Sequence, residues 1–67
     1  MKRYEYTQGN SNKFWEVEVN GNMLRVHYGR IGTKGQDNVK TFPTKDDALQ
    51  ARDELVKQKL GKGYEEV

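Results

Sequence analysis

Apolar and polar side chains alternate through most of the first 42 residues. Apolar residues recur at every second position over 13–19 and again over 22–31, which is the period of a half-buried strand. A shorter alternation predicts one strand at 3–7 and another at 36–42. The Asn20-Gly21 step joins the two longest runs and predicts a hairpin with a type I′ turn, in which both central residues have positive φ.

After Pro43 the apolar spacing becomes helical. Thr44 is a typical N-cap, with Asp47 three residues later as in a capping box, and Gly61 is a typical residue just past a helix end. These signals predict a helix over about 44–60. Six apolar residues fall on one half of its helical wheel: Ala48, Leu49, Ala51, Leu55, Val56 and Leu60.

Short connections between the strands favour antiparallel neighbours, with the helix packed on one sheet face. We therefore expect residues 1–67 to form a single small two-layer α+β domain with an antiparallel sheet of four or five strands. The helix should cover the face that carries Trp15, Val17, Leu24 and Val26. The opposite face should be exposed to solvent or receive a partner, with His27 exposed and Phe14 making a minor contact to Tyr4 or Tyr6.

Composition excludes several classes of protein. A chain of 67 residues can bury only one small core, which leaves no room for an enclosed substrate cavity. There is no cysteine and only one histidine, so we expect no catalysis, no metal, no cofactor and no small-molecule substrate. No apolar run reaches the ~18 residues of a membrane span, and the charged start lacks a signal-peptide pattern, so we expect a cytoplasmic location and no membrane partner.

The distribution of charge is more informative than the net charge of +2. Residues 1–40 carry seven basic and four acidic side chains, whereas residues 41–67 carry five basic and six acidic ones. Glycines at 29, 32 and 35 follow the third strand, but they lead into another strand and so match neither nucleotide-binding fingerprint. Such glycines would allow a close approach of nucleic-acid backbone, and nearby cations could face phosphates: Lys13, Arg25, Arg30, Lys34 and Lys40.

Several segments, in this order and spacing, resemble the WGR domain over nearly the whole chain. They are Asn12-Lys13-Phe14-Trp15, the run Tyr28-Gly29-Arg30-Ile31-Gly32-Thr33 with Gly35-Gln36, and a helix followed by Gly63-Tyr64. This module occurs in DNA-damage-activated poly(ADP-ribose) polymerases and in many bacterial proteins, and its name comes from a Trp-Gly-Arg triplet. Here Tyr28 stands in place of the Trp. The resemblance implies an antiparallel sheet crossed by one helix and a regulatory, non-catalytic role.

The resemblance also implies a DNA-binding function, because in the polymerases the triplet Trp packs against the sugar at a DNA end. Strict alternation places Tyr28 on the face beneath the helix, where it would be a core residue. The alternative is that a bulge at Gly29 turns Tyr28 outward, where it would be a contact residue. Arg30 is either a DNA contact or a structural arginine. The predicted function is binding of duplex DNA ends or nicks, and the alternative is a protein-interaction module using the same surface or the sheet edge. The predicted contact residues are Asn12, Lys13, Tyr28, Arg30, Lys34 and Lys40.

Overall fold

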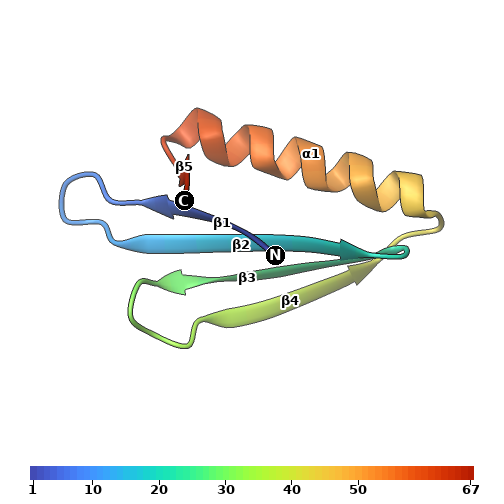
Figure 1. Cartoon of the computed structure of the whole chain (residues 1–67), viewed down its shortest axis with the longest axis horizontal. Coiled ribbons are helices and arrows are strands. Elements are labelled where there is room, and N and C mark those ends of the chain that lie inside the picture. Colours follow the sequence, from blue (N-terminus) through green and yellow to red (C-terminus); the bar gives the residue numbers. More distant parts are fainter.

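The computed structural model describes all 67 residues as one twisted sheet with a helix along one face (Figure 1). The elements are β1 (Lys2–Tyr6), β2 (Lys13–Asn20), β3 (Met23–Arg30), β4 (Gln36–Thr41), α1 (Lys45–Lys62) and β5 (Glu65–Glu66). The sheet order is β4-β3-β2-β1-β5, and every neighbouring pair is antiparallel. The predicted α+β class, strand count and single helix are confirmed.

The turn between β2 and β3 differs from the prediction. Its two loop residues are Gly21 and Asn22, and only Gly21 has a positive φ, of 61°. A glycine with positive φ at the first central position is the pattern of type II′ turns, so the expected type I′ turn at Asn20-Gly21 is wrong. Asn22 also holds the end of β4, since its side-chain amide donates to the Phe42 carbonyl at 2.7 Å.

The helix begins where the sequence indicated and ends two residues later. The Thr44 hydroxyl accepts a hydrogen bond from the Asp47 amide at 3.1 Å, which satisfies one of the free donors at the helix start. The predicted end at Gly61 is wrong, because Gly61 lies within the helix and Gly63 adopts the left-handed cap conformation with φ 107°. No helix is long and apolar enough to cross a membrane.

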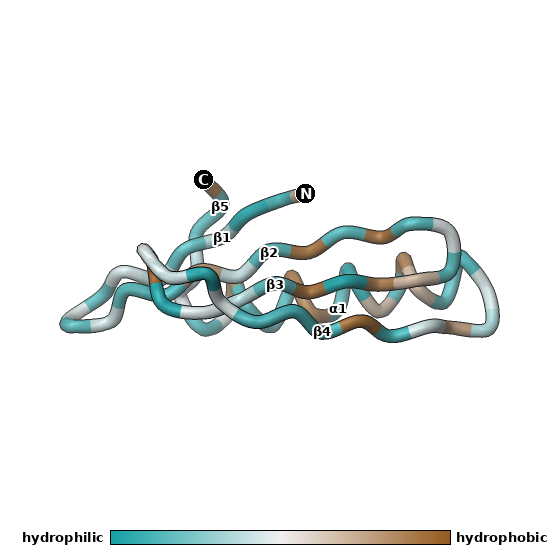
Figure 2. The backbone as a smooth tube through the Cα atoms, turned by 90° about the horizontal axis from the view of Figure 1, so that it is seen from below, coloured by the Kyte–Doolittle hydropathy of each residue, from teal (hydrophilic) through white to brown (hydrophobic).

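The main core lies between α1 and the middle of the sheet. Apolar positions alternate with hydrophilic ones along β2 and β3 (Figure 2), and one set points toward the helix. Tyr4, Trp15, Val17 and Leu24 form the buried cluster on the sheet, and Ala48 is the buried residue of the helix. Because α1 packs over β2 and β3, it leaves the whole of β4 exposed.

A second, smaller packing site lies on the face opposite α1, hereafter the far face. Phe14 is only 3% exposed there, although the pattern indicated an open face. The Arg3 guanidinium lies 4.5 Å from its ring centroid, and the His27 ring meets it edge-on at 5.2 Å. The expected contact with Tyr4 or Tyr6 is wrong, because the register places both tyrosines on the helix face.

Two glycines, one near the end of β3 and one in the β3–β4 connection, make this packing possible. A Cβ added to Gly35 would lie 2.7 Å from the Phe14 ring and 2.5 Å from the Tyr28 carbonyl oxygen. A Cβ on Gly29 would lie 2.8 Å from the Cα of Gly35. All three distances are shorter than atoms tolerate, so the connection can fold back over Phe14 only with glycine at these two positions.

Candidate nucleic-acid interface

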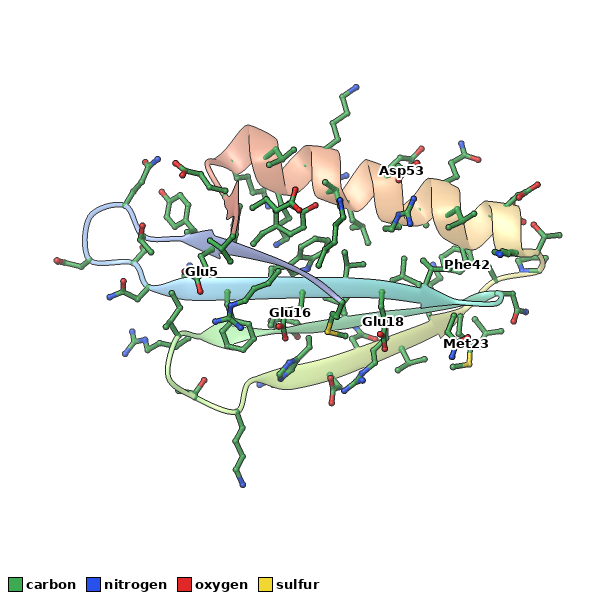
Figure 3. The ribbon with its side chains drawn as sticks, in the orientation of Figure 1. Glu5, Glu16, Glu18, Met23, Phe42 and Asp53 are labelled. Carbon is green, nitrogen blue, oxygen red and sulfur yellow. The ribbon has the colours of Figure 1, made fainter.

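The far face carries its charges as ion pairs, so it presents no free positive surface. Arg25 bonds Asp37 at 3.1 Å and Glu18 at 3.5 Å, while Arg3 bonds Glu5 at 2.9 Å and Glu16 at 3.3 Å. Figure 3 shows Glu5, Glu16 and Glu18 along β1 and β2. The expectation that Arg25 faces phosphates is therefore wrong, because two carboxylates already occupy its guanidinium.

His27 also belongs to this network and is not the exposed strand residue expected from the pattern. Its Nδ1 lies 2.8 Å from a Glu16 carboxylate oxygen, and its Nε2 bonds the Lys34 carbonyl. Both partners are acceptors, so only the protonated ring donates to both. The bond to the Lys34 carbonyl, followed by the Glu16 carboxylate, raises the pKa of His27.

Four cations without carboxylate partners lie together at one end of the sheet, on or beside the face that carries α1. Lys13 and Arg30 are direct neighbours across β2 and β3, on the face that carries α1. The last turns of α1 add Lys59 and Lys62, neither of which forms an ion pair. We call Lys13, Arg30, Lys59 and Lys62, together with Tyr28, the basic end.

The surroundings of the Lys59 ammonium show most clearly that the basic end has no neutralising carboxylate. Its ammonium lies 5.6 Å from the Trp15 ring and 5.0 Å from the Tyr64 ring. Partial burial, and then the charges of Lys62 and Lys13, lower its pKa. An anion bound at this point would relieve the repulsion among the three ammonium groups.

Tyr28 faces the helix side of the sheet and is still 39% exposed. It lies opposite Trp15 on β2 and Gln36 on β4, and its hydroxyl donates to the Gln36 side chain at 3.3 Å. The bulge proposed at Gly29 is absent, since the β2–β3 pairing continues without a break to Lys13 and Arg30. Tyr28 reaches solvent because α1 does not cover this part of β3.

The structure brings four of the six predicted contact residues close together. Lys13, Tyr28 and Arg30 belong to the basic end, and the Asn12 carbonyl accepts a bond from the Ile31 amide at 2.8 Å beside them. Lys34 lies at the same end of the sheet, in the β3–β4 connection, with its side chain exposed. Lys40 lies apart, opposite Leu24 near the other end of β3.

A family model described as the WGR domain matches residues 1–67. The chain belongs to the WGR family. WGR domains are nucleic-acid-binding modules with a regulatory role, and they are not themselves catalytic.

Relatives of this WGR domain are longer proteins. It is 37% identical over 65 residues to the Escherichia coli uncharacterized protein YfeS, and 39% identical over 66 residues to the E. coli protein YehF. These matches cover 97% and 98% of this chain but 27% and 24% of the relatives. A crystal structure of a Bacteroides fragilis protein, from the Northeast Structural Genomics Consortium, superposes with a TM-score of 0.96 at 36% identity, covering 98% of this chain and 19% of that one.

Of the glycines at positions 29, 32 and 35, two serve internal packing, so they are not available to nucleic acid as the sequence suggested. Gly29 and Gly35 meet each other and the Phe14 ring. Only Gly32, with φ 94° and nothing within 4 Å of an added Cβ, lies open to a ligand.

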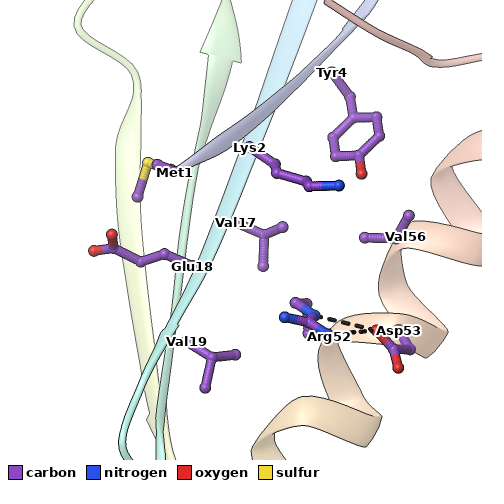
Figure 4. A pocket seen from close by; sticks show the side chains of 9 residues that line it. All are labelled: Met1, Lys2, Tyr4, Val17, Glu18, Val19, Arg52, Asp53 and Val56. Atoms are coloured by element: carbon purple, nitrogen blue, oxygen red, sulfur yellow. Dashed lines mark hydrogen bonds and ion pairs between the residues drawn. The ribbon is translucent and has the colours of Figure 1, made fainter.

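Two open grooves flank the helix of the WGR domain. The smaller, about 400 Å³, lies beside β1 and β2 (Figure 4). Its four charged side chains are all in ion pairs, including Lys2 with Glu66 at 3.7 Å and Arg52 with Asp53 at 3.0 Å. The larger, about 670 Å³, lies between α1 and β4 and includes Tyr28, Lys40 and Lys59.

Lys59 and Lys62 are not among the contact residues predicted from the sequence. The available signal was the pair of lysines in the last helical turn. Only the folded chain shows that this turn ends beside Lys13, which precedes it by more than 40 residues.

Proposed function

We propose that this WGR domain binds duplex DNA at ends or nicks through the basic end, with Asn12 and Lys34 at its margin. The observation that carries the proposal is a partly exposed tyrosine surrounded by cations that have no carboxylate partner. Every arginine outside this region is in an ion pair, whereas the basic end groups four cations without a carboxylate partner in one place.

The chemistry separates into two parts. Lys13, Arg30 and Lys59 neutralise backbone phosphates, which supplies sequence-independent affinity. Tyr28 stacks on a sugar or terminal base that is exposed only where a strand is interrupted, an interaction of about 1–3 kcal/mol for base stacking. No group at this end is arranged to read base edges, so recognition depends on DNA structure rather than on sequence.

A salt titration tests the phosphate part. The affinity for a short nicked duplex should fall steeply as salt rises, and Lys13→Gln and Arg30→Gln should each reduce the slope of log K against log salt by about 0.9. Lys57→Gln is the matched control, because Lys57 is an exposed lysine of α1 that is not part of the basic end. Binding that is independent of salt, or equal losses in all three variants, would contradict the proposal.

A second comparison tests the role of Tyr28. The domain should bind a nicked duplex more tightly than a closed circle of equal length, and Tyr28→Ala should abolish this difference. Tyr28→Trp should enlarge it, because the indole offers a larger stacking face. Equal affinity for nicked and closed DNA would exclude recognition of ends while leaving general DNA binding intact.

A protein partner is the second candidate, favoured by two exposed apolar side chains on the far face. Met23 is 42% exposed and Val39 is 52% exposed, and they are diagonal neighbours across β3 and β4. A partner that docks there would leave the basic end free, so Met23→Ser together with Val39→Ser would weaken its binding without altering DNA affinity.

A further inference from the structure

The larger groove runs beside α1 from the basic end toward the start of the helix. Its floor is β3 and its sides are α1 and β4, because the helix packs over β2 and β3 and leaves β4 uncovered. Its lining is mixed, with an apolar floor of Trp15, Leu24 and Val26. At about 670 Å³ and open to solvent, it has the size of a ligand site, but it does not enclose a small molecule.

An aromatic side chain lies at each end of this groove. Tyr28 lies at the basic end and is 39% exposed, while Phe42 lies where β4 leads into the helix and is half-buried (Figure 3). A flat aromatic face accepts any base by stacking, since every base presents a π surface. The groove therefore offers two stacking positions with an apolar floor between them.

The charge of the groove suits a polyanion. Lys59 lies at the end near Tyr28, and the Lys40 ammonium lies 5.2 Å from the Phe42 ring at the other end. Neither lysine has a carboxylate partner. Glu54 is the one acidic side chain that lines the groove, so two cations face one anion.

We propose that the groove between α1 and β4 binds the single-stranded extension of a DNA end. This inference rests on the proposed function, because the duplex part of the DNA would sit on the basic end and Tyr28 would mark the junction. Lys59 and Lys40 contact backbone phosphates near the two ends of the extension, and Phe42 stacks on a base at the far end of the groove.

The dimensions set the length of strand that fits. Phe42 lies opposite Asn22, which is six residues from Tyr28 along the β3 hairpin strand, a distance of about 20 Å at ~3.3 Å per residue. Stacked nucleotides advance about 3.4 Å along a strand, so the groove holds roughly six of them. Nucleotides beyond that number would leave the groove and add little affinity.

The experiment compares a blunt duplex with the same duplex carrying thymidine overhangs of about one, six and twelve nucleotides. A longer blunt duplex with the same number of phosphates controls for total charge. We expect the overhang of about six nucleotides to bind at least fivefold more tightly than either blunt duplex, and the overhang of about twelve to gain less than a further twofold.

Substitutions of residues that line the groove test whether the higher affinity for overhang duplexes arises there. The ratio of overhang to blunt affinity should fall below twofold in Lys40→Gln and in Phe42→Leu, which keeps an apolar side chain of similar size. The ratio should rise in Glu54→Gln, because the one carboxylate of the groove is removed. Lys57→Gln, an exposed lysine outside the groove, should keep the full ratio, and circular dichroism should show the native fold in every variant.

The outcomes separate the two proposals. Tight, salt-dependent binding to blunt and overhang duplexes with equal affinity would overturn the groove inference and leave the proposed function standing. A gain that grows steadily with overhang length, or that survives in both Lys40→Gln and Phe42→Leu, would also overturn it. Absence of binding to any duplex would overturn both.

Discussion

The close approach of Gly29 and Gly35 leads to a quantitative prediction about alanine substitutions at the end of β3 and in the β3–β4 connection. The three glycines of this segment differ in what an added methyl group contacts. Gly32 has φ 94° and open space, Gly29 has an ordinary φ and a backbone atom at 2.8 Å, and Gly35 has both φ 71° and contacts at 2.5 and 2.7 Å. The three variants therefore separate backbone strain from steric overlap.

The magnitudes follow from these two contributions. Gly32→Ala has only the left-handed backbone conformation to overcome, about 1 kcal/mol of lost unfolding free energy. Gly29→Ala has only the overlap with Gly35, about 1–3 kcal/mol. Gly35→Ala combines both and should lose about 3 kcal/mol, a large share of the ~3–10 kcal/mol expected for a 67-residue domain.

Urea denaturation of the three variants measures the effect, and each kcal/mol should also lower Tm by about 4–8 °C. The double variant Gly29→Ala/Gly35→Ala should lose less than the sum of its parts, because the connection has already moved off Phe14 after the first substitution. Equal losses in Gly32→Ala and Gly35→Ala would refute the close packing of this segment. So would a Gly35→Ala variant as stable as the parent.

Three further predictions concern the far face and the helix start. Phe14→Ala should lower the free energy of unfolding by about 3–5 kcal/mol in chemical denaturation, a loss expected of a core residue and too large for an exposed one. Because the pKa of His27 is raised in the folded state, its contribution to stability is complete below its ordinary value near 6.5 and is lost as pH rises through the raised value. The parent should therefore lose stability relative to His27→Gln as the pH rises above about 6.5, and parallel profiles for the two proteins would contradict the doubly bonded ring. Thr44→Ala should lower the unfolding free energy by about 1 kcal/mol, and Thr44→Ser should restore most of it, as seen by thermal melting.

Periodicity predicted the elements of this domain well because each strand has one buried face. Trp15, Val17 and Leu24 alternate with polar neighbours, so a shift of one residue would expose all of them. The helix start was equally clear, since Thr44 and Asp47 form a local hydrogen bond that depends on spacing alone. The helix end was harder to predict, because both Gly61 and Gly63 are suitable cap residues. Only Gly63 takes the left-handed conformation.

The candidate site was harder to predict because it depends on contacts between distant segments. Alternation gives the face of Tyr28 correctly, but its exposure depends on how far α1 extends across β3. The pairing of Arg25 with Asp37 links two strands, and the approach of Lys59 to Lys13 links the helix to β2. Local patterns carry no information about these distances.

The burial of Phe14 was missed for a related reason. Its neighbours in sequence indicate a mixed face, while the groups that cover it come from β1, β3 and the β3–β4 connection. The glycine spacing indicated an unusual backbone there, and internal packing fits that signal as well as the predicted approach of nucleic acid.

The most direct test of the central claim is an NMR titration of the labelled domain with a short nicked duplex. The basic end should respond first, with shifts of the amides of Lys13, Tyr28, Arg30 and Lys59 that diminish when salt is raised. Shifts centred instead on Met23 and Val39 of the far face, or a spectrum unchanged by DNA at low salt, would contradict it.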